Sequence, residues 1–274
     1  MAASKVVLVT GASSGIGKAI AETLMQEGYL VYGTSRKQEP GSVSAIATSP
    51  AGGALKMIYL DVCSDESAQQ AVAQIWKTEG RLDILVNNAG FGIAGAVELT
   101  TSEEVCRQLN TNFLGVQRMC RQVLPIMRRQ KEGRIINIGS VMGIFAIQFQ
   151  SVYSVSKFAL EALTEAMRIE VRPFGIKVTL VQAGDTRTGF VREFVAAAKE
   201  DRVYAERFIN SINGAEKAEK SGHRPEIVAK EVLRMIKKKH PPVRVTVGWL
   251  YKLFRFLKRF APDRLVEYVV TRFY

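Results

Sequence analysis

The sequence predicts an α/β fold, in which a doubly wound parallel sheet forms a single domain followed by a C-terminal amphipathic helical tail. Short apolar segments rich in β-branched residues alternate with amphipathic helical segments along the chain, which is typical of parallel sheets covered by helices. A glycine-rich turn follows the first apolar segment directly, and polar residues follow several later ones. Ligands bind at such strand ends in open α/β sheets.

The first unit comprises a strand, a turn and a helix. Residues 5–10 are short, apolar and β-branched, as in a buried parallel strand, and helical periodicity runs over 18–26. Between them the sequence Thr-Gly-Ala-Ser-Ser-Gly-Ile-Gly places glycines at Gly11, Gly15 and Gly17. Glycines allow a tight turn and close approach of a pyrophosphate, to which the helix N-terminus presents free N–H groups. The unit therefore predicts a Rossmann-type dinucleotide site.

The second strand, 29–34, indicates which dinucleotide binds. An NAD site usually places a carboxylate about 20 residues past the glycines, but here Arg36 stands nineteen residues after Gly17. A guanidinium suits a 2′-phosphate, which a carboxylate would repel. The alternative is an ordinary solvated arginine at a strand end. We expect NADP(H), with Arg36 as the main contact and with further candidate contacts at Ser13, Ser35 and Lys37.

The rest of the chain continues the alternation. Residues 38–53, rich in Ser, Pro, Gly and Ala, predict a loop or a short helix. Apolar runs predict further strands at 55–60, 82–86, 134–138, 176–181 and 243–247. Helical patterns cover 66–76, 102–124 and 153–171.

Polar residues at strand ends and inside one helix are candidates for function. Asp61 follows the third strand and can accept the adenine amino group or, alternatively, cap the next helix. Asn87-Asn88-Ala89-Gly90 follows the fourth strand. Asn110 and Asn112 lie inside the helix predicted at 102–124. Asparagine is disfavoured in mid-helix, so a local role is expected there.

Tyr153 and Lys157 stand four residues apart, so a helix places both side chains on one face. Lowering a tyrosine pKa from about 10 toward 7 requires roughly 4 kcal/mol, and a nearby ammonium in a partly dry cleft can supply that. Ser140, which follows the strand at 134–138, can hold a substrate oxygen against the tyrosine. The pair alone is weak evidence, because most such pairs are solvated helix faces; the predicted nucleotide site gives it weight.

Composition excludes several classes of function. The three cysteines, Cys63, Cys106 and Cys120, form no Cys-x-x-Cys pair, which favours a reducing, cytoplasmic setting. His223 and His240 have no metal-ligand spacing, so no metal site is expected. No apolar run reaches the roughly 18 residues that span a bilayer.

The basic charge is concentrated near the C-terminus. The net charge is +12, and residues 227–274 hold 12 Lys/Arg against 3 Asp/Glu. Within 249–260, a helix places five apolar side chains on one face and most of the basic ones elsewhere: Leu250, Leu253, Phe254, Leu257 and Phe260. This pattern is typical of a helix lying in an anionic membrane surface. The alternatives are packing on its own domain or on a partner subunit; nucleic-acid binding is not expected, because no reading motif is visible.

Several residue sets occur together in an order that identifies a family. The glycine turn 10–17, Asp61, Asn87-Asn-Ala-Gly90, Asn112, Ser140 and Tyr153-x-x-x-Lys157 resemble, over about residues 5–248, the short-chain dehydrogenase/reductase family in its compact branch. Around 153–165 and 172–175, the chain is similar to the subgroup that acts on steroids, retinoids and other lipophilic alcohols. Two departures are Ala183-Gly184 in place of Pro-Gly, and Gly139 in place of a serine.

The resemblance implies a catalytic tetrad of Asn112, Ser140, Tyr153 and Lys157. Tyr153 would be the acid/base, Ser140 would position the substrate oxygen, Lys157 would lower the tyrosine pKa and bind the nicotinamide ribose, and Asn112 would hold a water in a proton relay. The family pattern extends the cofactor site to a larger set: Ser14, Ile16, Asp61, Val62, Asn88, Ala89, Gly90, Gly184, Thr186 and Thr188.

The resemblance also implies boundaries and partners. Residues 1–248 would form the catalytic domain, with a mobile lid at about 186–222, and 249–274 a basic extension. A homodimer or homotetramer is expected. The predicted function is NADP(H)-dependent interconversion of an alcohol and a ketone or aldehyde on a lipophilic substrate: a steroid, a retinoid or an acyl derivative. The alternatives are an NADP(H)-binding sensor or scaffold without turnover, and an epimerase or dehydratase of the same superfamily.

Overall fold

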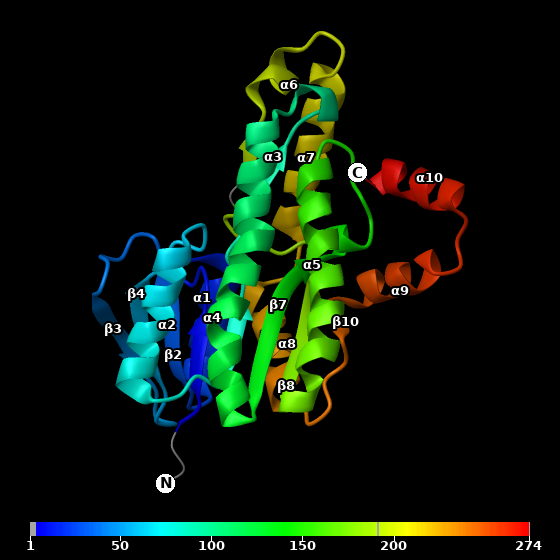
Figure 1. Cartoon of the computed structure of the whole chain (residues 1–274). Coiled ribbons are helices and arrows are strands. Elements are labelled where there is room, and N and C mark those ends of the chain that lie inside the picture. The colour runs from blue at the N-terminus through cyan, green and yellow to red at the C-terminus, as the bar shows by residue number, and fades with distance from the viewer. Residues whose placement is uncertain (1–3, 191, 274) are drawn as a thin grey trace.

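A central eight-stranded sheet with helices on both faces organises the computed structural model, which describes residues 4–190 and 192–273 (Figure 1). Its strands follow the order β10-β8-β7-β5-β1-β2-β4-β3, and all pairs are parallel except β3 with β4. In chain order they are β1 Val6–Val9, β2 Leu30–Ser35, β3 Val43–Thr48, β4 Ala54–Tyr59, β5 Ile84–Asn87, β7 Gly133–Ser140, β8 Ile176–Ala183 and β10 Arg244–Thr246. The predicted fold class, a doubly wound parallel sheet, is confirmed.

Helices cover the sheet in two layers. The main ones are α1 Gly15–Gln26, α2 Asp65–Glu79, α4 Gly115–Gln130, α5 Ser151–Val171 and α8 Pro225–Lys237. Residues of α1 and α8 share one core with the sheet, and residues of α2, α4 and α5 share the other. Because both faces are covered, all four residues of β1 are buried, which explains its unbroken apolar run.

A smaller layer lies above the C-terminal edge of the sheet. It comprises a two-stranded sheet of β6 Gly92–Ala94 and β9 Arg192–Phe194, with α3 Ser102–Leu109, α6 Ala196–Glu200 and α7 Ala205–Ser221. Its core includes Phe149, Val195, Phe208 and Ile212. Figure 1 shows α3, α6 and α7 rising above the ends of β7 and β8.

The structure corrects the prediction for 38–53. This segment contains β3, an antiparallel edge strand, rather than a loop or short helix. Because most of β3 is exposed, its sequence Val-Ser-Ala-Ile-Ala-Thr lacks the strict alternation of apolar and polar residues that would mark a strand.

The predicted helix over 102–124 is also corrected, since it is not a continuous α-helix. It is α3, a π turn over Asn110–Leu114, and α4. A π turn inserts one extra residue and re-aims the side chains at that point, and such turns often occur at functional sites. Both mid-helix asparagines lie in it.

The C-terminal residues form a two-helix arm. The helices α9 Trp249–Lys258 and α10 Asp263–Phe273 project from the side of the body next to α5 and β10 (Figure 1). Within the described ranges, no helix has both the length and the apolar character needed to cross a bilayer.

Candidate active site

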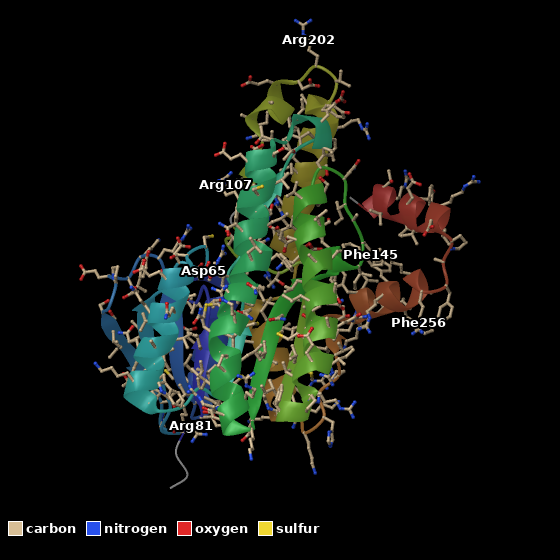
Figure 2. The ribbon with its side chains drawn as sticks, in the orientation of Figure 1. Asp65, Arg81, Arg107, Phe145, Arg202 and Phe256 are labelled. Atoms are coloured by element: carbon tan, nitrogen blue, oxygen red, sulfur yellow. The ribbon has the colours of Figure 1, made fainter. Side chains whose placement is uncertain are left out.

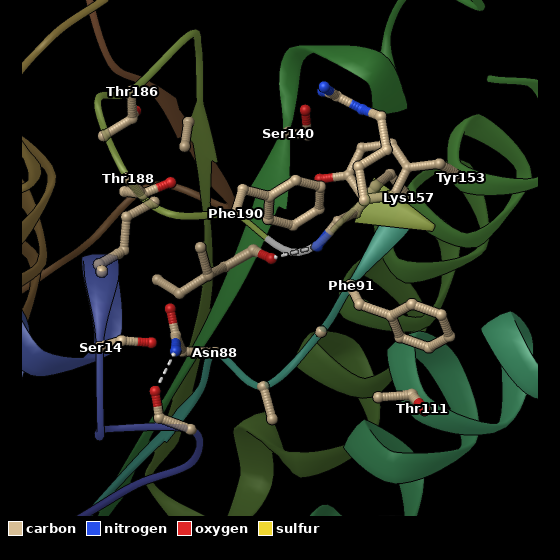
Figure 3. A pocket seen from close by; sticks show the side chains of 18 of the residues that line it. Ser14, Asn88, Phe91, Thr111, Ser140, Tyr153, Lys157, Thr186, Thr188 and Phe190 are labelled. Carbon is tan, nitrogen blue, oxygen red and sulfur yellow. Dashed lines mark hydrogen bonds between the residues drawn. The ribbon is translucent and has the colours of Figure 1, made fainter. Parts of the chain in front are cut away.

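A cleft of about 760 Å³ opens at the C-terminal ends of β1, β2, β5, β7 and β8. In the sheet order, β1 lies between β2 and β5, so this is the point where the chain reverses its winding direction. Doubly wound sheets bind nucleotides at that crevice. Figure 3 shows the glycine-turn residue Ser14 and Asn88 at one end of the cleft, and Ser140, Tyr153 and Lys157 at the other.

The glycine turn forms the floor of the cleft. A Cβ on Gly17 would lie 2.2 Å from the Gly11 carbonyl oxygen and 2.4 Å from Asn88 Nδ2, so only glycine fits there. The helix α1 begins at Gly15, and the side chain of its N-cap, Ser14, makes no capping hydrogen bond. The first turn of α1 is therefore a suitable cradle for a pyrophosphate.

Thr10 joins this turn to the end of β5. Its Oγ1 accepts from the backbone N–H groups of Asn88 and Ala89 at 2.9 and 3.0 Å. Asn88 Nδ2 donates in return to the carbonyl oxygens of Thr10 and Gly11 at 3.0 and 3.1 Å. The predicted Asn-Asn-Ala-Gly element thus fixes the shape of the cleft floor.

The end of β2 presents cationic side chains to the cleft. Arg36 and Lys37 are exposed and line it, and the Oγ of the buried Ser35 accepts from the Lys37 N–H at 3.1 Å. Asp61 and Val62 line the same region. Asp61 Oδ1 accepts from the Cys63 N–H at 2.9 Å, whereas Ser64 is the residue that caps α2. The alternative that Asp61 caps the helix is therefore wrong, because it stabilises the preceding turn.

Asn112 is a positioning residue in this structure. Its Oδ1 accepts from the Phe91 N–H at 3.1 Å, and its Nδ2 donates to the Phe91 carbonyl at 2.9 Å and to Ser156 Oγ at 3.1 Å. Ser156 Oγ in turn donates to the Tyr153 carbonyl at 2.7 Å. The amide thus connects the π turn to the first turn of α5, and the proposed water relay stays a prediction.

Ser140, Tyr153 and Lys157 meet at the inner end of the cleft. Ser140 Oγ accepts from the Met142 N–H at 3.1 Å, and Tyr153 is hydrogen-bonded to Ser140. Lys157 Nζ donates to the Ile138 carbonyl at 3.0 Å and lies 5.5 Å from the centre of the Tyr153 ring. Ser140 is thus the last residue of β7, and Tyr153 and Lys157 lie on α5.

Burial dominates the electrostatics of this group. It raises the pKa of the Tyr153 hydroxyl to about 12, while the hydrogen bond with Ser140 and the charge of Arg192 act in the opposite direction. The expected lowering of this pKa toward 7 by Lys157 is therefore not found in this structure, because burial outweighs the groups that lower the pKa. Burial lowers the pKa of the Lys157 ammonium to about 8. Proton affinities shifted in this way by burial mark candidate catalytic groups.

Most predicted cofactor residues line the cleft, but two predicted residues lie just behind its wall. Gly17 lies under the glycine turn and Asn112 behind Phe91 and Gly90. The predicted residues on the wall are Gly11, Ser13, Ser14, Gly15, Ile16, Ser35, Arg36, Lys37, Asp61, Val62, Asn88, Ala89, Gly90, Ser140, Tyr153, Lys157, Gly184, Thr186 and Thr188. No group of three or more potential metal ligands occurs among the residues described.

The apolar residues that flank the catalytic elements in the sequence divide into two sets. Phe91, Met142 and Phe190 line the cleft, with the Phe190 ring 5.6 Å from the Tyr153 ring in an edge-on arrangement (Figure 3). Ile93 and Phe149 instead pack in the core beneath the upper layer. The sequence could not separate the two sets, because both have the same composition.

Two buried residues that shape the site are absent from the sequence-based set. Gln108, fully buried, bonds to the backbone of Phe91 and Ile93. Asn137 of β7 accepts from Asn87 Nδ2 and donates to Thr164 Oγ1, both at 2.9 Å, which holds α5 against the sheet. Their only signal in the sequence is a polar residue at a position that the pattern assigns to the core.

Tyr251 of α9 supports the cofactor loop after β8. A Cβ on Gly184 would lie 2.1 Å from Tyr251 Cε2, so the ring packs directly on that glycine. The Tyr251 hydroxyl donates to the Asp185 carboxylate and accepts from the Asp185 N–H at 3.3 Å. This packing supports a loop that lacks the proline expected beside Gly184.

Comparisons with known proteins agree with this geometry. A family model described as short chain dehydrogenase matches residues 5–199. The chain is 44% identical over 273 residues to a 3-ketodihydrosphingosine reductase of Bacteroides thetaiotaomicron, covering 98% of each chain. It is 34% identical to the retinol dehydrogenase 8 of Bos taurus, covering 95% of this chain and 87% of that one.

Solved structures of other proteins show that the fold is similar as well as the sequence. A short-chain dehydrogenase from Streptomyces avermitilis matches with a TM-score of 0.81 and 32% identity, covering 99% of this chain and 96% of that one. Other structures with this fold hold NADP or NAD.

Proposed function

Because the chain belongs to the short chain dehydrogenase family of oxidoreductases, we propose that it interconverts a ketone and an alcohol on a lipophilic substrate, with NADP(H) as its cofactor. The observation that carries the proposal is that two sets of residues, a cofactor-binding half and a catalytic half, line the same cleft. The glycine turn and Arg36 line one end, and Ser140, Tyr153 and Lys157 line the other. A protein that only sensed the nucleotide would have no use for the second half.

The cofactor half fits NADP(H). The glycines leave room for a pyrophosphate against the N-terminus of α1. Arg36 and Lys37 provide two exposed cations at the end of β2, where the adenosine ribose lies in folds of this kind. A guanidinium binds a phosphate through paired hydrogen bonds. We therefore propose NADP(H) rather than NAD(H).

The chain's own residues account for the proton transfer. In the reducing direction, the Tyr153 hydroxyl donates its proton to the substrate oxygen, which becomes the alcohol hydroxyl. Ser140 holds that oxygen by a hydrogen bond, and the Lys157 ammonium stabilises the phenolate left behind. The bound cofactor supplies the hydride for the carbon. Burial excludes water, which strengthens both interactions.

Several features favour a lipophilic, long-chain ketone as substrate. Phe91, Met142 and Phe190 provide apolar surface beside the reacting group. The relative with 44% identity is named for reduction of a 3-ketodihydrosphingosine, a ketone on a long alkyl chain. We propose a substrate of that class, with steroids and retinoids as competing candidates.

The arm α9–α10 suits attachment to an anionic membrane, where such a substrate would reside. Arg255 and Lys258 of α9 point inward: Arg255 donates to Thr246 Oγ1 at 3.3 Å, and Lys258 donates to the Ile144 carbonyl over the Phe145 ring. The outer face carries exposed apolar side chains, with Leu253 43%, Phe256 61% and Leu257 48% exposed. Figure 2 shows Phe145 on the body side of α9 and Phe256 on its outer side.

An exposed apolar helix face beside cations is the arrangement that inserts into a membrane interface. We propose a cytoplasmic enzyme that docks peripherally through this arm. A homodimer or homotetramer is the assembly proposed by family likeness.

The test is substrate competition with purified protein. NADPH oxidation would be followed with a long-chain 3-ketone, a steroid ketone and retinal at equal concentration. Preference for the long-chain ketone supports the substrate class, and preference for either of the others overturns it. Tight NADPH binding without turnover of any carbonyl would favour the sensor alternative.

A further inference from the structure

An ion pair stands in the substrate half of the cleft, and the chemistry above does not use it. Arg192 of β9 is bonded through Nη2 to the Glu219 carboxylate of α7. Both residues line the cleft together with Tyr153. Their side chains are 9% and 22% exposed, so the pair is largely removed from water.

The pair is close enough to the catalytic tyrosine to act on it. The Arg192 guanidinium carbon lies 5.9 Å from the centre of the Phe190 ring, which lies 5.6 Å from the centre of the Tyr153 ring. The charges of Arg192 and Glu219 also shift the pKa of Tyr153, in opposite directions. A substrate whose carbonyl reaches Tyr153 therefore occupies the part of the cleft that Phe190 and this pair also line.

Arg192 has a hydrogen-bond donor without a partner. Its Nε is buried and bonds to no group in the part of the chain that the structure describes. A buried donor left unpaired costs about 1–3 kcal/mol, and such groups in native proteins usually have a partner. An oxygen of a bound substrate would satisfy it.

Glu219 provides the complementary acceptor. Burial raises the pKa of its carboxyl, and the charge of Arg192 opposes that shift. A second cation placed against the carboxylate would offset the cost of its burial. The pair thus presents one unpaired N–H donor, on Arg192, and one partly buried carboxylate, on Glu219, that a further cation would stabilise.

We propose that Arg192 and Glu219 form a head-group subsite, which binds an ammonium group and a hydroxyl on the carbon atoms next to the reacting carbonyl. The ammonium donates to Glu219, and the hydroxyl oxygen accepts from Arg192 Nε–H. The substrate is then an amino ketone with a polar end and a long apolar chain. This inference rests on the proposed function, since it places the reacting carbonyl at Tyr153.

The subsite explains why a cleft with aromatic walls also contains a buried ion pair. An apolar pair of similar volume would hold β9 against α7 at least as well, because desolvation offsets most of the attraction in a buried ion pair. The subsite also separates substrate classes: a steroid ketone or retinal has no ammonium and leaves the Arg192 donor unpaired.

The test compares two ketones in the native enzyme and in Glu219→Gln. One is a long-chain 3-ketone with a 2-amino and a 1-hydroxyl group, and the other is the same chain without them. We expect Glu219→Gln to lower kcat/KM for the amino ketone about 10- to 100-fold, the range of a hydrogen bond to a charged group, and to leave the plain ketone within about 3-fold. Equal losses for both ketones would overturn the subsite and indicate a purely structural pair.

A matched control and a second variant keep the test decisive. Glu216→Gln changes a carboxylate on the same helix that pairs with Lys220 and is 45% exposed, and it should affect neither ketone. Glu219→Gln leaves Arg192 buried without a counter-charge, which is destabilising. If it fails to fold, the double variant Arg192→Gln/Glu219→Gln supports the same comparison.

A binding measurement separates failure of the subsite from failure of the proposed function. Calorimetry with Tyr153→Phe would compare the long-chain 2-amino-1,3-diol with the corresponding 3-alcohol, and no turnover is needed. We expect tighter binding of the amino diol, lost on adding Glu219→Gln. Equal binding of the two alcohols would overturn the subsite, whereas selective binding without ketone turnover in the native protein would refute only the proposed reaction.

Discussion

The Lys157 ammonium lies 5.5 Å from the centre of the Tyr153 ring and donates to the Ile138 carbonyl at 3.0 Å. The bond to Ile138 holds the cation beneath the tyrosine without consuming a counter-ion. Burial lowers the pKa of Lys157 to about 8, so the side chain is still mostly charged at neutral pH. The site thus retains a positive charge where a phenolate would form, at a cost to the stability of the fold.

That cost predicts a stabilising substitution. Between about pH 8 and pH 10 the unfolded chain binds more protons than the folded one, so the Lys157 contribution to the unfolding free energy rises with pH across that window. Below pH 8, burial of the ammonium costs up to about 3 kcal/mol. Lys157→Met should therefore abolish turnover and raise the Tm at pH 7 by a few degrees.

Calorimetric melting of the two proteins at pH 7 and pH 9.5 checks this, because the difference in Tm should shrink at the higher pH. Lys18→Met, a change at a side chain that is 58% exposed, serves as control and should leave Tm unaltered. A lower Tm for Lys157→Met at pH 7 would show that the ammonium stabilises the fold.

Arg36 should determine the preference between the two nicotinamide cofactors. Its guanidinium is exposed at the end of β2 and lines the cleft. Loss of a charge-assisted contact to a 2′-phosphate costs about 1.5–3 kcal/mol, so Arg36→Ala should weaken NADPH binding about 10- to 100-fold and change NADH binding little. Fluorescence titration with both cofactors measures this, with Lys18→Ala as the charge-matched control. A parallel loss for NADH and NADPH would argue against a phosphate contact.

Tyr251 should tighten cofactor binding from outside the cleft. Its hydroxyl is bonded to Asp185, next to the loop that contributes Gly184, Thr186 and Thr188 to the cleft wall. Tyr251→Phe keeps the ring against Gly184 and removes the hydrogen bonds, so the Kd for NADPH should rise about 2- to 10-fold. Tyr268→Phe on α10, where the side chain is 68% exposed, is the control. An unchanged Kd would mean that the ring alone supports the loop.

The outer face of α9 should attach the protein to anionic membranes. Co-sedimentation with vesicles containing phosphatidylserine should pull down the native protein, and the double variant Leu253→Glu/Leu257→Glu should stay in solution, because charge on that face opposes insertion. Ile169→Glu alters an apolar side chain on α5 that is 75% exposed and should sediment like the native protein. Retention of the double variant on vesicles would exclude this face as the attachment site.

The parts of the site that were predictable depend on short stretches of sequence. The turn from Gly11 to Gly17 and the Tyr153–Lys157 pair are each contained within one turn and one helix, so local spacing identified them. The same holds for the strands buried on both faces, whose apolar runs are continuous. These features follow from rules of local geometry and burial that need no knowledge of distant contacts.

The features that the sequence did not predict depend on contacts between distant residues. Arg192 meets Glu219, and Tyr251 meets Asp185 across 66 positions of the chain. Nothing local distinguishes these side chains from solvated ones. The π turn at Asn110–Leu114 was likewise missed, because the apolar period across it differs little from that of an unbroken helix.

The helix α9 has one feature that the sequence predicted and one that it did not. Of the five residues predicted on the apolar face, Leu250, Leu253, Leu257 and Phe260 are exposed, whereas Phe254 is half-buried. Its basic residues were expected simply to lie elsewhere, yet Arg255 and Lys258 turn toward the body, where Thr246 and Ile144 accept their hydrogen bonds. Helical periodicity gives the angle between side chains, but only the fold determines which of them face the protein.

The central claim is that Tyr153 transfers the proton during NADPH-dependent ketone reduction, and single-turnover kinetics tests it most directly. Saturating NADPH would be mixed with a long-chain 3-ketone, and both the loss of NADPH and the alcohol formed would be measured for the native protein, Tyr153→Phe and Tyr59→Phe. We predict one alcohol formed per NADPH consumed in the native protein and in Tyr59→Phe, and a rate reduced at least about 100-fold in Tyr153→Phe. Unchanged turnover in Tyr153→Phe, with NADPH binding intact, would contradict the account.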